Sequence, residues 1–335
     1  MPRGLALKEV RSPESGVRRS ARSAGLRTPD SGLALAVTHG GVGAPTDHSD
    51  GCAAAAAATL GALARRRSAL DAVVAGAVLL EDDPRFNAGT GSHLRLDGRT
   101  VQMDAAVMDS SGRLGAVAAI EFVKNPILVA RAVVETPHVL LCADGAIAFA
   151  RARGFPRYRV VTAGMRARWQ KVVDAINSGR KKSLPTSWRR FNIPESWNFR
   201  RKIADVLGCD TIGVVVRDAR GNFAVANSTG GSSPMLRGRI GDSPIAGAGY
   251  WAGPAGAVAA TGQGEEMIRR LLCKTVYDWI AAGASAQAAC ARGVALIPAD
   301  IHVGLIAVSA TGHGAADNRQ MPWAAADSSG RTWGP

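Results

Sequence analysis

Short apolar runs alternate with glycine- and proline-rich turns along most of the chain. The apolar run 33–38 ends at His39-Gly40-Gly41, a pattern that predicts a buried strand entering a glycine turn. The alanine-rich stretch 50–80 predicts one or two packed helices, because alanine has the highest helix propensity. Further elements are expected as strands within 99–109, 114–122 and 304–309, a helix that begins at Asn125-Pro126, and an amphipathic helix over 265–282.

The clearest local signal is a pair of strands joined by a short polar turn. Residues 211–217 and 223–229 are both rich in apolar residues, and the turn between them is centred on Arg220, a pattern typical of a hairpin. Symmetric pairing places Thr211 opposite Thr229, and the Cβ atoms of directly opposed residues lie about 4.5–5.5 Å apart. The two hydroxyls are therefore expected within hydrogen-bonding reach. An ordinary Thr–Thr cross-strand pair is the alternative to a functional one.

The neighbours of the two threonines favour a catalytic role. A threonine hydroxyl is a poor nucleophile unless a base lies close by. Cleavage of the chain before Thr211 would free its α-amine, whose ordinary pKa of about 7.7–8 suits a base. Asp210 stands directly before Thr211, and the second strand ends in Ser228-Thr229-Gly230-Gly231. These neighbours weaken the interpretation as an ordinary cross-strand pair, and an N-terminal threonine nucleophile is one arrangement that would fit them.

Polar and glycine-rich motifs follow one another in a fixed order on both sides of this hairpin. They are His39-Gly40-Gly41-Val42-Gly43, Phe86-Asn87-Ala88-Gly89-Thr90-Gly91-Ser92, 103–109, 115–119, Asp210-Thr211-Ile212-Gly213-Val214, 228–231, 238–245 with 247–249, and Thr261-Gly262-Gln263-Gly264-Glu265. Over about 33–155 and 208–310, their order and spacing resemble those of the asparaginase, isoaspartyl peptidase and glycosylasparaginase family of N-terminal-nucleophile hydrolases.

The resemblance implies a fold and a maturation step. It implies an α+β fold, a four-layer αββα sandwich, made as one precursor. The precursor would cleave itself between Asp210 and Thr211 into a large α chain, 33–210, and a small β chain, 211–335, which stay together. Self-association as a dimer of αβ units is expected by the same resemblance.

The resemblance also implies catalytic roles. Thr211 would attack the side-chain amide of asparagine or a β-aspartyl peptide and form an acyl-enzyme ester, and Thr229 would orient it. The Thr261 hydroxyl and the Gly262 N–H would form the oxyanion hole, which needs donors where negative charge develops. A tight turn that caps a helix is the plain interpretation of the Thr261-Gly262 segment, and both can hold.

Substrate recognition is expected from a charged, glycine-rich loop. Arg239 and Asp242 suit the α-carboxylate and α-ammonium of an amino-acid substrate, because arginine offers two parallel donors to a carboxylate. A mutual surface ion pair, worth roughly 0–1 kcal/mol, is the alternative. By resemblance, Asn87 and Gly264 would also line the pocket.

A structural sodium ion is a further expectation by resemblance. Hard cations accept carbonyl oxygens as ligands, and a plain loop is the alternative here. The candidate ligands are Leu80, Glu81, Asp83, Phe86, Ala88 and Thr90. No cofactor is expected for catalysis itself.

The net charge of +14 is concentrated in two segments. Residues 1–32 carry a net +4, and residues 165–202 carry a net +9 from eleven Lys or Arg and two acids, so the remaining chain is nearly neutral. Because these tracts do not form a basic face on a folded surface, nucleic acid is not the expected partner. We expect 1–32 to be a disordered basic tail and 156–207 to be a basic linker or excursion.

The composition excludes several classes of protein. Apolar residues make up 47% of the 335 and charged residues 20%, which excludes a disordered or fibrous protein. No apolar run reaches the roughly 18 residues of a membrane-spanning helix, so no membrane insertion is expected. The five scattered cysteines are odd in number and lack a CxxC pair, which favours a reducing compartment. We therefore expect a cytoplasmic protein.

The sequence leaves the substrate open. Isoaspartyl dipeptides and L-asparagine are the leading candidates, and N4-(β-N-acetylglucosaminyl)-L-asparagine is the alternative within the family. The segment Ser187-Trp188-Arg189-Arg190-Phe191 is similar to the glycosylasparaginase branch, and Met235 stands where many relatives carry lysine. A non-catalytic binding protein that uses the basic, aromatic segment 165–202 is the alternative of another class. All of the expected catalytic positions are present, which argues against it.

Overall fold

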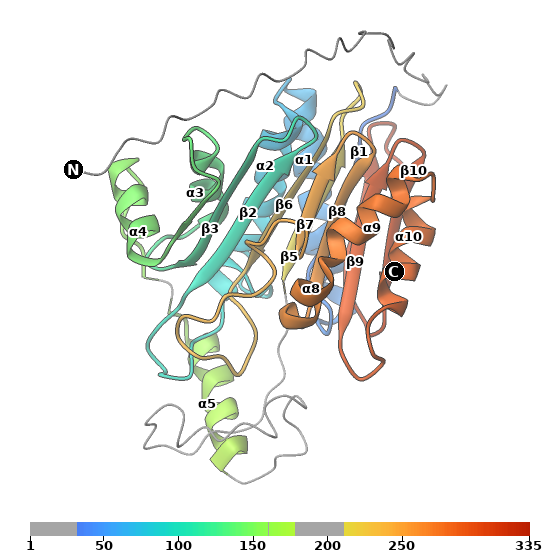
Figure 1. The fold of residues 1–335 in the computed structure, drawn as a ribbon. Coiled ribbons are helices and arrows are strands. Elements are labelled where there is room, and N and C mark those ends of the chain that lie inside the picture. The colour runs from blue at the N-terminus through green and yellow to red at the C-terminus, as the bar shows by residue number, and fades with distance from the viewer. Residues whose placement is uncertain (1–31, 160, 178–210) are drawn as a thin grey trace, which may run out of the picture.

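The computed structural model describes residues 32–159, 161–177 and 211–335. The expected basic tail up to residue 31, the cleavage-site residue Asp210 and the segment 178–207 of the linker lie outside the described residues. Two sheets form the centre of the described chain, and helices lie on their outer faces (Figure 1).

The larger sheet has eight strands. In spatial order they are β12 (Thr332–Trp333), β11 (Trp323–Asp327), β1 (Leu35–His39), β5 (Ile212–Arg217), β6 (Phe223–Thr229), β2 (Met103–Asp109), β3 (Leu114–Ile120) and β4 (Leu140–Cys142). Neighbouring strands are antiparallel except β3 and β4, which are parallel.

The smaller sheet has four antiparallel strands. Their order is β10 (Gly312–Asp317), β9 (Val303–Ser309), β8 (Gly256–Gly262) and β7 (Tyr250–Gly253). The helices are α1 (Ser49–Ala64), α2 (Ala69–Asp82), α3 (Pro126–Val133), α4 (Ala143–Ala152), α5 (Ala163–Asn177), α8 (Gly264–Arg270), α9 (Leu272–Ala281) and α10 (Ala286–Ala295). Short 3-10 turns lie at Thr46–His48 and Gly89–Gly91.

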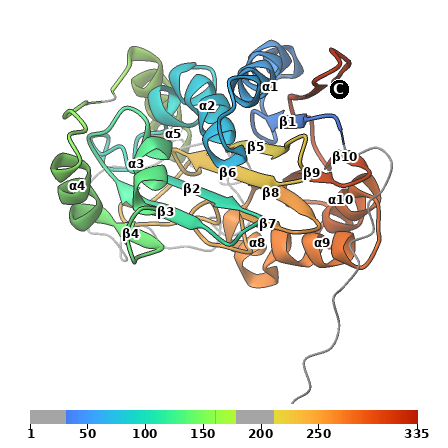
Figure 2. The same ribbon diagram turned by 90° about the horizontal axis from the view of Figure 1, so that it is seen from above.

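Three apolar cores hold these elements together. The first lies between the larger sheet and helices α1 to α3, the second between the two sheets, and the third between the smaller sheet and helices α9 and α10 (Figure 2). Strand β5 shows how the sequence achieves this. Val214 and Val216 belong to the first core and Val215 to the second, because alternate side chains of a strand point to opposite faces. Its continuous apolar run therefore reflects burial on both sides.

Most of the predicted elements are confirmed with small changes of length. The predicted helix over 265–282 is wrong in one respect, because α8 ends at Arg270 and α9 begins at Leu272. Leu271 between them adopts a left-handed conformation with φ 45°, which interrupts the helical hydrogen bonds. The mixed helix-and-strand class with two sheets is confirmed.

The beginning of the expected linker is helical. Helix α5 packs against the body through buried residues, among them Met165 and Val172. The Trp169 indole N–H donates to the Leu96 carbonyl oxygen at 3.3 Å, and Arg168 Nη2 donates to the Gly91 carbonyl oxygen at 2.8 Å. Residues 163–177 therefore belong to the folded body.

Candidate active site

The two threonines of the hairpin meet at one end of the larger sheet. The pairing of Ile212 with Ser228 is that of the predicted register, which puts Thr211 opposite Thr229. The Thr211 hydroxyl donates to Thr229 Oγ1 at 3.3 Å, and the Gly231 N–H also donates to Thr229 Oγ1, at 3.0 Å. Thr211 is only 5% exposed and Thr229 3%. The cross-strand prediction is confirmed, and Thr229 is fixed by a second donor.

The loop that contains Asn87 clamps the end of β6. The Asn87 side-chain amide donates to the Gly231 carbonyl oxygen, and its own Oδ1 accepts from the His93 N–H at 3.1 Å. The Gly230 N–H donates to the backbone carbonyl of Asn87 at 2.8 Å. A Cβ on Gly230 would lie 2.5 Å from both Asn87 Oδ1 and the Ser92 Cα, so this approach requires glycine. Asn87 is thus adjacent to the threonine pair, as expected of a pocket residue.

Met235 supports the same turn from behind. It is 1% exposed, and its sulfur contacts the buried guanidinium of Arg95. Arg95 in turn donates to the Gly230 carbonyl oxygen at 3.2 Å. The residue that departs from the family pattern therefore packs under the Gly230–Gly231 turn.

Thr261 and Gly262 come to this end of the molecule from the smaller sheet. A Cβ on Gly213 of β5 would lie 3.0 Å from the Ala259 Cβ of β8, so the two strands are in contact across the interface of the sheets. Strand β5 begins, and β8 ends, at the lower end in Figure 1, where α8 follows. Thr261 is fully buried, and its Oγ1 accepts from the Val42 N–H at 3.2 Å.

Gly262 occupies a backbone position that excludes other residues. Its φ is +139°, and an added Cβ would overlap the carbonyl oxygen of His302. The plain interpretation, a turn that leads into a helix, is confirmed, because α8 begins at Gly264 directly after it. Thr261 and Gly262 thus stand at the end of β8, directly before the helix begins.

Arg239 and Asp242 lie close together, but they do not form the mutual ion pair that was the alternative. Arg239 donates twice to Glu265, from Nε to Oε1 and from Nη2 to Oε2, both at 2.9 Å. Partial burial raises the pKa of Glu265, and the Arg239 bonds outweigh this and hold the pKa below its ordinary value. The prediction of a mutual Arg239–Asp242 ion pair is wrong, because Glu265 takes the guanidinium.

Asp242 is buried between two glycines. A Cβ on Gly264 would lie 2.6 Å from Asp242 Oδ1, and one on Gly249 would lie 2.8 Å from Asp242 Oδ2. The Gly249 carbonyl oxygen accepts from the Asn227 side-chain amide at 2.8 Å, which connects this loop to β6. Glycine at both positions therefore leaves the space that the Asp242 carboxyl fills.

The electrostatics of Asp242 differ from those of an exposed acid. It is 3% exposed, and burial raises its pKa to about 7, although the nearby positive charge of Arg239 lowers it. Its Oδ2 atom has no hydrogen-bond partner among the described residues. A carboxyl that is ionised near neutral pH and retains acceptor capacity suits a substrate ammonium group.

The residues of the expected sodium loop surround Gly89–Gly91. A Cβ on Gly89 would overlap the Glu81 carbonyl oxygen, and one on Gly91 would overlap that of Phe86 and lie 2.8 Å from that of Pro84. The Thr90 hydroxyl is buried with no partner among the described residues. Oxygen donors of this kind fit a hard cation. The loop also forms its own bonds, since Gly91 N–H donates to the Ala88 carbonyl and Asp83 binds Arg85.

Sequence reasoning missed the contacts that two buried groups make beside the threonine pair. The Glu81 carboxyl accepts from Ser228 Oγ at 2.6 Å and from the Ile127 N–H at 3.0 Å, so it joins α2, α3 and β6 beside Thr229. The fully buried imidazole of His39 faces Gly213, where a Cβ would overlap it. Burial lowers the His39 pKa to about 3, so the ring is neutral. No local pattern in the sequence indicates either contact.

Among the described residues, no group of three or more His, Cys, Asp or Glu is arranged to hold a metal ion. The helices of these same segments are all too short or too polar to cross a bilayer. The four cysteines in this part of the chain are unpaired.

The comparison with family models matches residues 32–333 to the family described as asparaginase. This match covers nearly all of the described chain, including every predicted site residue within it.

Three relatives carry names that differ in the activity they state. The chain is 42% identical over 234 residues to a plant-type L-asparaginase of Pyrococcus horikoshii, covering 69% of this chain and 73% of that protein. It is 36% identical over 305 residues to the human isoaspartyl peptidase/L-asparaginase, covering 87% and 92%. It is 38% identical over 263 residues to the N(4)-(β-N-acetylglucosaminyl)-L-asparaginase of Elizabethkingia miricola, covering 75% and 71%.

Proposed function

Because the chain belongs to the asparaginase family and is a hydrolase of that family, we propose that it is a self-cleaving threonine amidohydrolase that acts on β-aspartyl amide bonds. Its substrates are isoaspartyl dipeptides, L-asparagine or both. The observation that supports this most strongly is the hydrogen bond between Thr211 and Thr229, next to the Gly230–Gly231 turn that Asn87 binds.

Maturation is the first reaction of the proposed mechanism. The Thr211 hydroxyl attacks the carbonyl carbon of Asp210, the peptide C–N bond breaks, and Thr211 Oγ holds Asp210 as an ester. Water hydrolyses this ester, which leaves a carboxylate on Asp210 and a free α-amine on Thr211. The amine then has the ordinary pKa range of a base that activates its own hydroxyl.

Substrate hydrolysis repeats the chemistry with an external amide. Thr211 Oγ attacks the β-carbonyl carbon of the substrate, the amine or ammonia leaves with the proton taken from the hydroxyl, and water releases aspartate from the ester. Thr229 holds the nucleophile in place, because its hydroxyl is itself fixed by the Gly231 N–H. Thr261 and Gly262 supply donors for the oxyanion, whose loss in comparable enzymes costs about 10²–10³ in kcat.

Recognition of the aspartyl end falls to the charged loop. Arg239 binds the α-carboxylate, and Asp242 binds the α-ammonium, with Gly264 and Asn87 lining the same pocket. Glu265 holds the guanidinium with two hydrogen bonds. The two opposite charges therefore bind the α-carboxylate and the α-ammonium group that β-aspartyl substrates share.

The finer features of the family complete the proposal. We infer an αββα sandwich, which the three apolar cores support, and a dimer of αβ units in the cytoplasm. When bound, a sodium ion would stabilise the loop through the carbonyl oxygens of Leu80, Glu81, Asp83, Phe86, Ala88 and Thr90. Catalysis itself needs no cofactor in this proposal.

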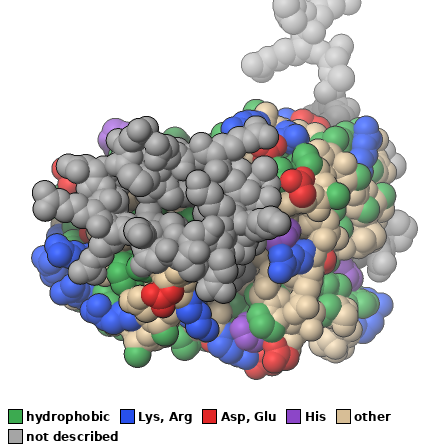
Figure 3. Space-filling model, turned by 90° about the horizontal axis from the view of Figure 1, so that it is seen from below, with side chains coloured by type: hydrophobic (Ala, Val, Ile, Leu, Met, Phe, Trp, Pro, Cys, Tyr) green, Lys and Arg blue, Asp and Glu red, His purple; other side chains and the backbone are tan. Residues whose placement is uncertain are grey.

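Two alternatives remain distinguishable. The Elizabethkingia relative favours hydrolysis of the sugar–asparagine bond as the second candidate within the family. A binding protein built on residues 165–202 is less well supported, because helix α5 packs its apolar residues on the body. On the described part of the face seen from below, Lys and Arg side chains lie among Asp and Glu (Figure 3).

A substrate panel tests the proposal. Purified full-length protein, Thr211→Ala and the exposed control Thr46→Ala would be incubated with a β-aspartyl dipeptide, L-asparagine and N4-(β-N-acetylglucosaminyl)-L-asparagine. We expect release of aspartate from one of the first two by the wild type and by Thr46→Ala, and none by Thr211→Ala. Hydrolysis of the glycosylated substrate alone would favour the alternative. Equal activity of Thr211→Ala would overturn the assignment of the nucleophile.

A further inference from the structure

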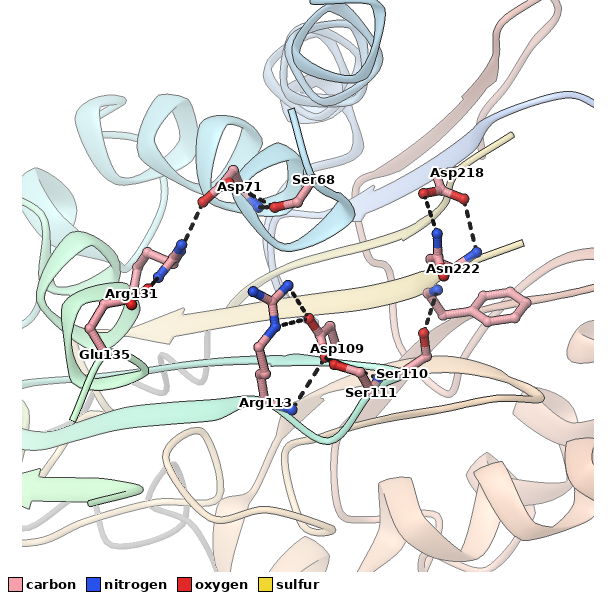
Figure 4. A network of polar contacts seen from close by, with 11 residues as sticks. Ser68, Asp71, Asp109, Ser110, Ser111, Arg113, Arg131, Glu135, Asp218 and Asn222 are labelled. Carbon is pink, nitrogen blue, oxygen red and sulfur yellow. Dashed lines mark hydrogen bonds and ion pairs between the residues drawn. The ribbon is translucent and has the colours of Figure 1, made fainter. Parts of the chain in front are cut away.

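A second concave site lies at the opposite end of the strands that carry the threonines. It is a cleft of about 890 Å³ between the α1–α2 turn, the β2–β3 turn and the β5–β6 turn. Figure 4 shows some of its polar lining residues, among them Ser68, Asp109, Arg113 and Asp218. Thr211 and Asp218 flank the two ends of strand β5, and seven residues at about 3.3 Å each separate them by roughly 23 Å. The cleft is thus separate from the candidate active site, and its volume is that of a small-molecule site.

Four arginines line this cleft. Arg66 and Arg67 come from the α1–α2 turn, Arg113 from the β2–β3 turn and Arg220 from the β5–β6 turn. Arg113 pairs with Asp109, with its Nη2 2.6 Å from Oδ2. Within the described chain, the guanidinium groups of the other three have no ion pair and no hydrogen bond. Three guanidinium groups from two separate turns therefore line one cavity without an ion pair among the described residues.

The two acids of the lining are already occupied. Asp109 accepts from Arg113 Nε at 2.7 Å and from the Ser111 hydroxyl at 2.6 Å. Asp218 closes its own turn, because it accepts from the backbone N–H of Arg220 at 2.8 Å and that of Asn222 at 2.9 Å. These carboxylates stabilise the turns, and the four arginines outnumber the two acids, so the lining carries a net positive charge of two.

The backbone of the α1–α2 turn is also unusual. Arg66 has φ 59°, the left-handed region that residues with a side chain rarely adopt. The Arg67 N–H bonds to the Ala62 carbonyl at 3.1 Å, which holds the turn against the end of α1. Glycine or asparagine would adopt this conformation with less strain, so arginine at this position is consistent with a requirement for its charge.

We propose that this cleft binds a small polyanion, a molecule with two or more carboxylate or phosphoryl groups on a short carbon skeleton. Guanidinium groups match both anions, because their parallel N–H donors bind two oxygens at once. Leu60, Leu63 and Ala64 form the apolar part of the lining and would contact the skeleton. The basic segment 1–32 is unsuited as an occupant, since it carries the same sign of charge.

The experiment must separate this site from the basic tracts elsewhere in the chain. Citrate and pyrophosphate serve as probes and are titrated calorimetrically into full-length protein at about 0.1 M ionic strength, where charges beyond about 10 Å are screened. The variants are Arg66→Ala/Arg67→Ala and, from the other turn, Arg220→Ala. Arg65→Ala is the matched control, because Arg65 belongs to the same turn but lies along α1 near Gly61, outside the cleft lining.

The affinities of the wild type and the variants for the two probes test the proposal. We expect at least one probe to bind the wild type, with affinity reduced about tenfold or more in Arg66→Ala/Arg67→Ala and clearly reduced in Arg220→Ala, and within about twofold of wild type in Arg65→Ala. If only citrate binds, the ligand belongs to the carboxylate class. If only pyrophosphate binds, it belongs to the phosphoryl class. Failure of both probes to bind the wild type, undiminished binding in the double variant, or an equal loss in Arg65→Ala would each overturn the proposal.

Discussion

A single methyl group at Gly264 is expected to disturb substrate binding without touching a threonine. Gly264 is the first residue of α8. An alanine Cβ there would lie 2.6 Å from Asp242 Oδ1, 2.9 Å from the Asp242 backbone nitrogen and 3.0 Å from Arg239 Nη2. The Asp242 backbone nitrogen can move only if the surrounding loop moves with it. The added methyl group of Gly264→Ala therefore displaces both proposed substrate-binding residues, Asp242 and Arg239.

The size of the effect follows from these distances. Restoring an ordinary contact of 3.4 Å requires Asp242 Oδ1 to move by about 0.8 Å. A misplacement of about 1 Å can cost about 10²-fold in rate, so we expect kcat/KM to fall about 10- to 100-fold, mostly through KM. Overpacking costs about 1–3 kcal/mol of stability, offset by the roughly 1 kcal/mol that alanine gains over glycine in a helix.

Steady-state kinetics with the preferred β-aspartyl substrate would measure this effect, beside an intact mass spectrum that checks maturation. Gly145→Ala is the matched control, because Gly145 lies in α4 with no atom within 4 Å of an added Cβ. The control should behave as wild type. Unchanged KM in Gly264→Ala, with the protein folded and matured, would refute the placement of Asp242 and Arg239 in the pocket.

Three further predictions concern pH, charge and packing. Asp242 must be ionised to bind an ammonium group, so with a pKa raised to about 7 by burial, kcat/KM should fall about tenfold per pH unit below 7, and Asp242→Asn should flatten that limb in a pH-rate profile. The protonated Asp242 carboxyl stabilises the folded state, and this contribution is fully present below the ordinary pKa of 3.8 and is lost as the pH rises through about 7. Thermal unfolding measured as a function of pH would detect the loss. Glu265→Gln removes the charged partner of Arg239 and should raise KM about tenfold with kcat largely retained, whereas an unchanged KM would mean that Glu265 does not position Arg239. Gly76→Ala would bring a Cβ into overlap with Thr59 Oγ1 between α1 and α2, so urea denaturation should show a loss of about 1–2 kcal/mol, and an unchanged midpoint would contradict the packing.

The hairpin shows what the sequence alone could predict. Its register depends on local features, namely two apolar strands and a turn with a definite centre, so the opposition of Thr211 and Thr229 was accessible without coordinates. Strand β8 was not predicted, because it is built from small residues of low strand propensity. Its position between a sheet and a helix layer requires that small size, and this is a tertiary constraint.

The supporting contacts of the site were inaccessible for a related reason. Glu81 and Ser228 are 147 residues apart, and neither stands in a pattern that indicates the other. The Arg239–Glu265 pair joins two motifs that the sequence presents separately, so Glu265 was not expected as the partner of Arg239. The break at Leu271 depends on a backbone conformation that leucine rarely adopts, and helical periodicity continues across it.

The intact mass of purified full-length protein after incubation at neutral pH tests the central claim most directly. Wild type and Thr211→Ala would be compared by mass spectrometry, with Thr46→Ala as a control that retains every proposed catalytic group. We predict two fragments that meet between Asp210 and Thr211 in the wild type and in Thr46→Ala, and one uncut chain in Thr211→Ala. A wild type that remains a single chain while it hydrolyses β-aspartyl substrates would contradict the account, because Thr211 would then act without the free amine assigned to it as base.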